Sequence, residues 1–149
     1  MSDTVRQTIA DRLLAMLQGM SKENGYSEDY PYIDEWRLTG FEDAEKPAIV
    51  LIDPEQSVVA TDRIKTDWLL NITISIIAKG DESQSDLRNY AADIYKCIGA
   101  DPGLGDIGVD IVPKGDTLQL SQEDDVYGDI DIRFEIAYST KTWDLTCLL

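Results

Sequence analysis

The chain has no histidine and only two cysteines, Cys97 and Cys147, among its 149 residues. The absence of histidine excludes nucleophilic catalysis by Ser-His-Asp or Cys-His arrangements. Zinc sites built from His and Cys are nearly excluded as well, because two cysteines far apart in the sequence supply too few ligands. Two cysteines also make no disulfide framework, so we expect reduced thiols in a reducing compartment.

Basic residues are also scarce. Thirteen Lys and Arg stand against 29 Asp and Glu, which leaves a formal net charge of −16. Affinity for nucleic acid depends mainly on Lys and Arg at the phosphates, so this balance argues against nucleic acid as a bound ligand. Three interpretations of the acidity stay open: a solvated surface that aids solubility, cation binding, or a surface that repels DNA passing close by.

Long apolar runs are missing too. No stretch approaches the roughly 20 apolar residues that a membrane-spanning helix needs, so no membrane contact is expected. The N-terminus lacks the basic start and the continuous apolar run of a signal peptide. We therefore expect a chain that is made and used in a cytoplasm and folds as a single domain over residues 1–149.

The clearest pattern that is present is the alternation in residues 129–138, DIDIRFEIAY. Apolar side chains occupy every second position, with charged ones between them. The charged residues are Asp129, Asp131, Arg133 and Glu135. Neighbouring side chains of a strand point to opposite faces, so this stretch predicts a strand with one apolar and one charged face. Residues 68–78 repeat the arrangement, and two such strands indicate a sheet that is covered on one face and open on the other.

Two stretches have the period of amphipathic helices, with apolar residues recurring at spacings of three and four. They cover residues 5–20 and 87–98. A turn is predicted at residues 113–116. Further strands are predicted at residues 32–38, 48–52, 107–112 and 117–120. The helices supply the apolar stripes that the covered sheet face needs. We therefore predict an α+β fold, a mostly antiparallel sheet of four to five strands with two helices packed on one face.

Residues 53–67 and the tail at 141–149 are less regular. The first stretch holds no sustained pattern, and it predicts either a functional loop or a long, twisted hairpin that leads into the strand at 68–78. The tail ends in apolar side chains on an otherwise acidic chain. We expect it to dock, either on the domain itself or on a neighbour.

Two patterns that suggest chemistry have simpler interpretations. Residues 103–108 satisfy GxGxxG, but they follow a predicted helix and open a strand, whereas the dinucleotide fingerprint follows a strand and opens a helix. The acidic residues 123–125, with Asp129 and Asp131, could gather around Ca²⁺, but their spacing does not match an EF-hand loop. No catalytic residue, cofactor or metal ligand is assigned, and we expect a protein that is not an enzyme.

The order of the predicted elements and several stretches resemble one family. These stretches are RQTIADRLLAML near the start, PAIV after a turn, LLNITISIIAKG, ADIYKCIGADPGLG, and GDIDIRFEIAYSTKTWD near the end. Together they resemble the tail-terminator and minor tail proteins of long-tailed bacteriophages, over about residues 5–143.

The resemblance implies a structural virion protein without enzymatic activity. Subunits of such proteins form a ring, commonly a hexamer, on the head-proximal end of the tail tube, where the ring ends tube polymerisation and offers the head-joining surface. The implied partners are further copies of the chain, the tail tube protein and the head–tail connector protein, and DNA passes through without specific binding. Assembly takes place in the cytoplasm of the host bacterium. The family's interface residues form no fixed motif, so none is carried over.

Two surfaces of this chain are candidates for those contacts. The charged face of residues 129–138 is expected to line the channel, because an acidic wall repels DNA phosphates. The loop predicted at 53–67 is the candidate contact with the tube or a neighbour. Its charged residues are Asp53, Glu55, Asp62, Arg63 and Lys65. Two alternatives stay open: another phage neck or head-completion subunit of similar fold, and a small α+β domain that binds Ca²⁺ or another ligand.

Overall fold

A computed structural model describes residues 3–37, 40–80, 84–122 and 126–149. Within these residues it contains two α-helices and six strands. They are α1 (Val5–Gln18), β1 (Tyr32–Glu35), β2 (Ala48–Thr61), β3 (Lys65–Ile77), α2 (Gln84–Gly99), β4 (Asp110–Gln122), β5 (Val126–Lys141) and β6 (Asp144–Leu148). The strands form one sheet in the order β1-β2-β3-β5-β4, with β6 paired to β5. The β1–β2 pair is parallel, and the other strand pairs are antiparallel.

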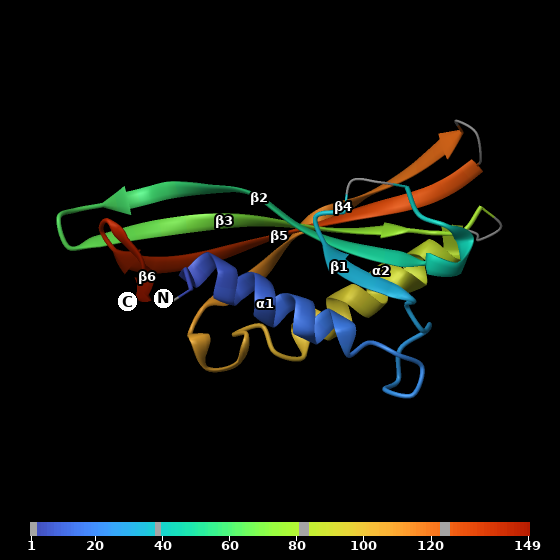
Figure 1. Cartoon of the computed structure of the whole chain (residues 1–149), viewed down its shortest axis with the longest axis horizontal. Helices are drawn as coiled ribbons and strands as arrows, with labels where there is room; N and C mark the ends of the chain where they lie inside the picture. The colour runs from blue at the N-terminus through green and yellow to red at the C-terminus, as the bar shows by residue number, and fades with distance from the viewer. Residues whose placement is uncertain (1–2, 38–39, 81–83, 123–125) are drawn as a thin grey trace.

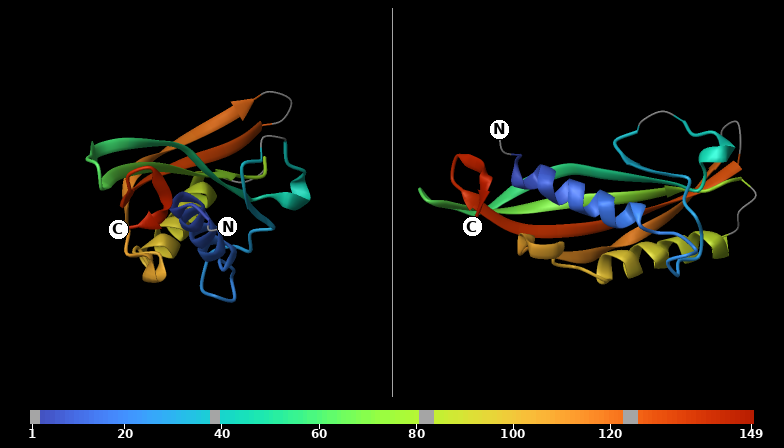
Figure 2. Two further views of the ribbon diagram at one scale, coloured as in Figure 1. Left: turned by 60° about the vertical axis from the view of Figure 1, so that its left-hand side comes forward. Right: turned by 60° about the horizontal axis from the view of Figure 1, so that its bottom comes forward.

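Both helices lie on the same side of the curled, elongated sheet (Figure 1). In the left view of Figure 2 both helices lie beneath the strands, which shows the same layering from another direction. The predicted α+β fold with two helices on one sheet face is therefore confirmed. The sheet has six strands because the tail, for which no strand was predicted, forms β6.

The helices form where the sequence predicts them. The Thr4 side chain accepts a hydrogen bond from the backbone N–H of Gln7 at 3.1 Å and so caps the start of α1. The helix ends at Gly19, whose N–H donates to the carbonyl of Met16 at 3.2 Å. Helix α2 ends at Gly99. Each helix buries one apolar stripe, which for α1 comprises Val5, Ile9, Ala10, Leu13 and Leu17.

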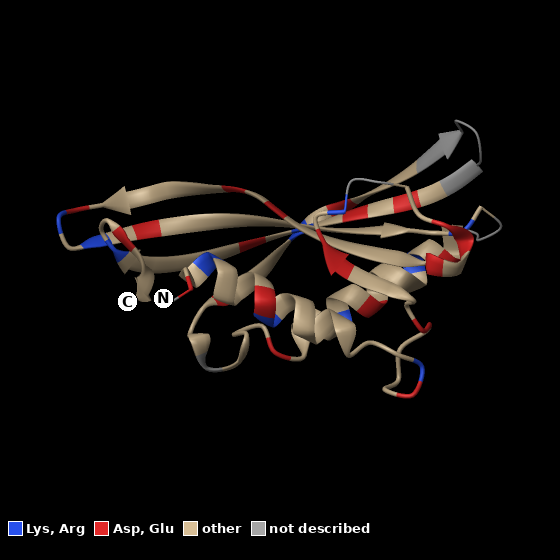
Figure 3. Cartoon of the chain, in the orientation of Figure 1, with Lys and Arg blue, Asp and Glu red and all other residues tan. Residues whose placement is uncertain are grey.

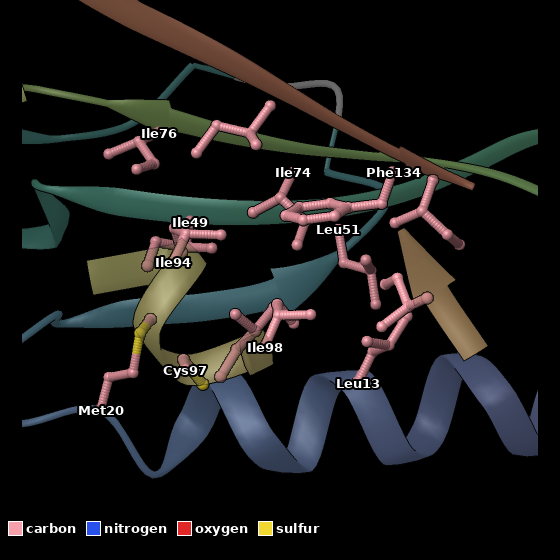
Figure 4. Close-up of a cluster of buried hydrophobic side chains, with 14 of the residues drawn as sticks. Leu13, Met20, Ile49, Leu51, Ile74, Ile76, Ile94, Cys97, Ile98 and Phe134 are labelled. Carbon is pink, nitrogen blue, oxygen red and sulfur yellow. The ribbon is translucent and has the colours of Figure 1, made fainter. Parts of the chain in front are cut away.

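The core lies between these stripes and the central strands β3 and β5. The two strands pair in one unbroken register, which places Ile72 opposite Phe134 and Ile74 opposite Ile132. Every second side chain on them is buried on the helix side. These side chains are Leu70, Ile72, Ile74, Ile76, Ile130, Ile132, Phe134, Ile136 and Tyr138. Figure 4 shows Leu13 of α1 and Ile98 of α2 facing Ile74 and Phe134 across this core. The predicted apolar face of residues 129–138 is confirmed.

Strand β4 differs from the prediction in two ways. It begins at Asp110 and not at residue 107, because residues Gly105–Ile107 form a 3-10 turn. It also continues through the turn predicted at 113–116. Pro113 lacks a backbone N–H, but β4 is the last strand of the sheet order and so tolerates proline. The pairing with β5 shifts between Pro113 and Gly115, and Gly115 takes a φ of 131° that favours glycine.

The stretch at 53–67 is the long hairpin that the sequence allowed, and not an irregular loop. Strand β2 runs to Thr61 and β3 begins at Lys65, so backbone groups that a loop would expose to water are paired between strands. The register shifts between Ile52 and Glu55 and again further along β2. Such irregularities interrupt the alternation of side chains, which explains why the sequence has no sustained pattern there.

The remaining two strands are short. The strand predicted at 32–38 is confirmed over Tyr32–Glu35, and it ends there because Trp36 has a left-handed φ of 53°. Residue 38 lies outside the described residues. The tail docks on the domain itself through β6, with Thr140 opposite Leu148 in the β5–β6 pair.

Candidate functional site

The charged residues of β5 lie in a row on the sheet face opposite the helices. The row comprises Asp129, Asp131, Arg133 and Glu135. Successive members are two strand residues apart, a distance of about 7 Å. Figure 3 shows the acidic members as red segments on β5. The sequence predicted this grouping, and the structure brings all four residues to one face.

Neighbouring strands hold these side chains in place. The Ser75 hydroxyl on β3 donates to Oδ1 of Asp131 at 2.6 Å. On the other side, Arg133 donates to the Thr117 hydroxyl of β4 at 3.0 Å. The Lys114 ammonium pairs with Glu135 at 3.6 Å, which offsets part of the negative charge. The row is therefore an ordered polar surface with three cross-strand contacts.

Asp129, at the start of the row, is in the least favourable environment. Its Oδ1 is buried and has no hydrogen-bond partner among the described residues. Burial raises the pKa of the Asp129 carboxyl above its ordinary value, and the negative charge of Asp131 adds to that rise. Ionised Asp129 thus destabilises the fold at neutral pH, and nothing in the described part of the chain compensates for it.

The five charged residues predicted for the contact loop are not brought together. Asp53 lies at the middle of β2, where its carboxylate accepts hydrogen bonds from Nε of Arg6 at 2.8 Å and from Nε1 of Trp36 at 2.7 Å. It therefore ties α1 and the end of β1 to the sheet. Glu55 is exposed on the same strand, opposite Asn71 of β3. These two acids are separate from the turn of the hairpin.

Asp62, Arg63 and Lys65 do lie together, at the β2–β3 turn. The Asp62 carboxylate accepts hydrogen bonds from the backbone N–H of Ile64 at 2.7 Å and of Lys65 at 2.8 Å. The two backbone hydrogen bonds, led by that from Lys65, hold the pKa of the Asp62 carboxyl below its ordinary value. Lys65 pairs with Asp67 at 3.4 Å. The turn is therefore built by its own charged residues.

The turn between β5 and β6 lies directly beside this hairpin turn. The Thr142 backbone N–H donates to the Ile64 carbonyl at 3.0 Å, and the Thr142 hydroxyl donates to the Asp62 carbonyl at 2.7 Å. We call residues 62–65 and 141–143 together the tip. In Figure 1 the tip is the left-hand end of the molecule, where β2, β3 and β5 extend beyond the helices.

Large apolar side chains are exposed mainly at or beside the tip. Those of this region are Val58, Val59, Ile64, Trp143, Leu145 and Leu149. Trp143 is 97% exposed and Ile64 is 76% exposed. The sequence showed the apolar tail, but it did not show that the hairpin places residues 58–64 next to that tail. No sequence signal links the two stretches, because the contact depends on the pairing of β3 with β5.

A second feature that sequence reasoning missed is a buried carboxylate on α2. Asp93 accepts hydrogen bonds from the Tyr30 hydroxyl at 2.6 Å and from the backbone N–H of Ser27 at 3.0 Å. Burial, followed by the hydrogen bond to Asp93 and its negative charge, raises the pKa of the Tyr30 hydroxyl far above its ordinary value. These contacts fasten the segment after α1 to α2, and they are structural.

Other patterns acquire no chemical role. Residues 103–108 connect α2 to β4, as expected for a glycine-rich connection. The acids at 123–125 lie outside the described residues, so their grouping with Asp129 and Asp131 is not placed. In the part of the chain that the structure covers, no three Asp, Glu or Cys side chains converge as metal ligands. Nor does any helix there have the length and apolarity to cross a membrane.

No protein-family model matches the chain, and no curated protein matches it. Among the described residues, two surfaces are suited to contact with other molecules: the charged row on the open sheet face and the apolar tip.

Proposed function

We propose that this chain is a structural protein of a bacteriophage tail. It forms a homo-oligomeric ring, commonly of six copies in the proteins that its sequence resembles, on the head-proximal end of the tail tube. The ring ends tube polymerisation and provides the surface that joins the head. Its partners are the tail tube protein and the head–tail connector protein, and it works in the virion after assembly in the bacterial cytoplasm. It catalyses no reaction and needs no cofactor.

The observation that supports this proposal most is the difference between the two faces of one sheet. The helices cover the apolar face, and the other face presents the charged row of β5 to solvent. A ring around DNA benefits from subunits with such a face, because ordered acidic side chains repel the phosphates of the passing molecule. Cross-strand contacts such as that of Ser75 with Asp131 provide this order.

The negative charge of the open face would repel DNA phosphates in this role. Asp129, Asp131 and Glu135 outnumber Arg133 in the row, and the whole chain carries a net charge of −16. Several copies around a channel concentrate this charge, which raises the free energy of a phosphate near the wall. DNA then moves through without the Lys and Arg contacts that produce tight binding.

A different neck or head-completion subunit is the second candidate. The sequence resembles a family of similar folds, and an acidic face with an exposed apolar tip suits any ring between head and tail. The difference between the candidates lies in the partner, because a terminator binds the open end of the tube and a completion protein binds the connector.

Purified tube protein of the same phage provides the test. We expect the chain to bind only at tube ends and to shorten the tubes when it is added during polymerisation, as electron microscopy with length measurement would show. Binding to the connector protein with no effect on tube length would favour the second candidate. If the chain binds neither partner but binds Ca²⁺ stoichiometrically in a calorimetric titration, the proposal is wrong and the ligand-binding alternative takes its place.

A further inference from the structure

The tip combines exposed apolar side chains with several cations. Trp143 and Ile64 are the most exposed large apolar residues of the described chain. Beside them, Arg63 makes no ion pair with any residue that the structure describes, while Lys141 faces Asp144 across the β5–β6 turn. In a chain with more than twice as many acids as bases, a projection that holds Arg63, Lys65 and Lys141 against the single acid Asp62 is unusual. These cations indicate a partner that supplies carboxylates.

A surface with the opposite properties lies between the start of α1 and the end of β1. A hollow there is lined by Thr4, Gln7, Glu35, Trp36 and Asp53, among others. Exposed Asp34 adjoins it on β1, and exposed Asp11 adjoins it on α1. The Trp36 ring is about half exposed, so an apolar surface accompanies the acids. We call this surface the α1–β1 hollow.

Like charges crowd the α1–β1 hollow. Burial raises the pKa of the Glu35 carboxyl, and the negative charges of Asp53, Asp11 and Asp34 raise it further. A cation placed here would relieve this repulsion. Arg6 already pairs with Asp53, but Asp11 and Asp34 have no ion-pair partner among the described residues. The hollow and its margin therefore hold the single base Arg6 against several acids, whereas the tip holds more bases than acids.

The tip of a molecule cannot reach the hollow of the same molecule. Asp53, which lines the hollow, lies eight strand positions before Thr61, the last residue of β2 before the tip, a distance of about 26 Å. The strand is held on its other side by β3 over this whole length, so it cannot fold back. A contact between the two surfaces must therefore join two molecules.

We propose that the tip of one copy of this chain binds the α1–β1 hollow of a second copy. Arg63 and Lys141 of the tip face the carboxylates of Asp11, Asp34 and Glu35. The exposed side chains of Ile64 and Trp143 pack against the hollow and the ring of Trp36. Carboxylates thus face cations, and both partners bury apolar side chains away from water.

A head-to-tail contact fits these charges better than a twofold one. A twofold contact through the tip alone would place the cations of one tip against those of the other, and a reciprocal twofold contact of tip with hollow would use both surfaces and stop at a dimer. A head-to-tail contact uses two different surfaces and leaves one of each free, so further copies can add until a ring closes. This contact would join the subunits of the ring, and that part of the inference rests on the proposed function. The contact itself is tested on the pure protein.

Charge reversal on either surface tests the contact. We expect the pure wild-type protein to self-associate in sedimentation velocity runs, more strongly as protein concentration rises. Arg63→Glu at the tip and Asp34→Lys at the hollow should each weaken association at least about tenfold, the effect of losing about 1.4 kcal/mol. The double variant with both substitutions should recover most of the affinity, because the pair is restored with its charges exchanged. Matched controls are Arg88→Glu on α2 and Asp110→Lys on β4, both exposed, which should associate as the wild type does.

Mixing the two single variants distinguishes the geometry. In an equimolar mixture the tip of Asp34→Lys meets the hollow of Arg63→Glu, and the two substituted surfaces also carry opposite charges, so the mixture should associate although neither variant does so strongly alone. A twofold contact through the tip alone predicts instead that Asp34→Lys by itself associates as the wild type does. Trp143→Ala should weaken association without a change in net charge, which separates the apolar contribution from the ionic one.

Several results would overturn the contact. They are a wild-type protein that stays monomeric at its highest soluble concentration in both low and high salt, an Arg63→Glu variant that associates normally, and a double variant no better than the singles. Failure here is distinguishable from failure of the proposed function. If the wild-type protein caps tubes and its Arg63→Glu variant still associates, the proposed function is supported and the proposed contact is wrong. If the protein associates through the tip but neither caps tubes nor binds the connector, the proposed contact is supported and the proposed function is wrong.

Discussion

Tyr95 on α2 and Phe134 on β5 pack edge to face, with ring centroids 5.8 Å apart and planes at 61°. Phe134 is buried, while the Tyr95 hydroxyl stays near the surface and donates to Asp116 of β4 at 2.7 Å. Burial raises the pKa of the Tyr95 hydroxyl to about 12, and the hydrogen bond to Asp116 and its negative charge contribute to that rise. One tyrosine thus connects the helix layer to both the central strand and the edge strand.

Phe134→Ala should lower the free energy of unfolding by about 3–5 kcal/mol, because it removes a buried ring and leaves a cavity beneath α2. Urea titration followed by circular dichroism measures this. The neighbouring variant Arg133→Ala, on the exposed face of the same strand, should change stability by no more than about 0.5 kcal/mol. Equal effects of the two variants would contradict the assignment of faces on β5.

Asp93→Ala should destabilise the fold by about 3 kcal/mol, because it leaves the Tyr30 hydroxyl and the Ser27 N–H without their acceptor. Tyr30→Phe removes one hydrogen bond and leaves the carboxylate its bonds to Ser27, so about 1 kcal/mol is expected. Thermal or urea unfolding gives both values. If Asp93→Ala proved as mild as Tyr30→Phe, the buried carboxylate would not be what fastens this segment to α2.

Asp129 should make stability depend on pH. Its folded-state pKa is raised, so the unfolded chain loses the proton at a lower pH than the folded chain does. The contribution of Asp129 to the free energy of unfolding is therefore most favourable below the ordinary carboxyl pKa. It is lost as the pH rises through the pKa of the folded state. Asp129→Asn should stabilise the protein at pH 7 and have little effect at about pH 3. Unfolding curves at the two pH values test this, and an equal effect at both would contradict it.

Gly115→Ala should cost about 1–2 kcal/mol, because alanine is strained at the φ of 131° that the β4 irregularity requires. The added methyl group has room, with the Arg133 guanidinium at 3.5 Å, so the cost comes from the backbone. Gly40→Ala, where nothing lies near the added methyl group and φ is ordinary, is the control and should be close to neutral. A neutral Gly115→Ala would show that β4 can pair with β5 without this irregularity.

The charged row should keep the assembled protein from holding DNA. Replacing Asp131 and Glu135 together by lysine should make rings retard double-stranded DNA in a gel, more weakly as salt is raised, whereas wild-type rings should not. The control carries the same change in charge at Asp3 and Glu23, two exposed acids away from the open face. If the control bound DNA as well as the lysine variant did, total charge and not the position of the row would be responsible.

Strong periodicity made much of the fold predictable. The alternation around Phe134 predicted a buried face and a charged face, and the spacing from Val5 to Leu17 predicted the face of α1 that packs on it. These patterns succeed because each repeats one rule over many residues. The prediction failed where a single residue breaks the rule, as at Gly115, since an edge strand can absorb such an irregularity and continue.

The sequence by itself determined the α+β class, the charged row and the exclusion of histidine chemistry, because each depends on residue types or on spacing along one segment. Only the tertiary structure decided that Ile64 and Thr142 are neighbours, with a backbone hydrogen bond of 3.0 Å between them. Ile64 lies in the turn between β2 and β3, and Thr142 lies in the turn between β5 and β6. No pattern in either stretch predicts that the two turns are neighbours. They meet because β3 pairs with β5 over its whole length, and this long-range pairing places the turn that holds Trp143 beside the turn that holds Arg63.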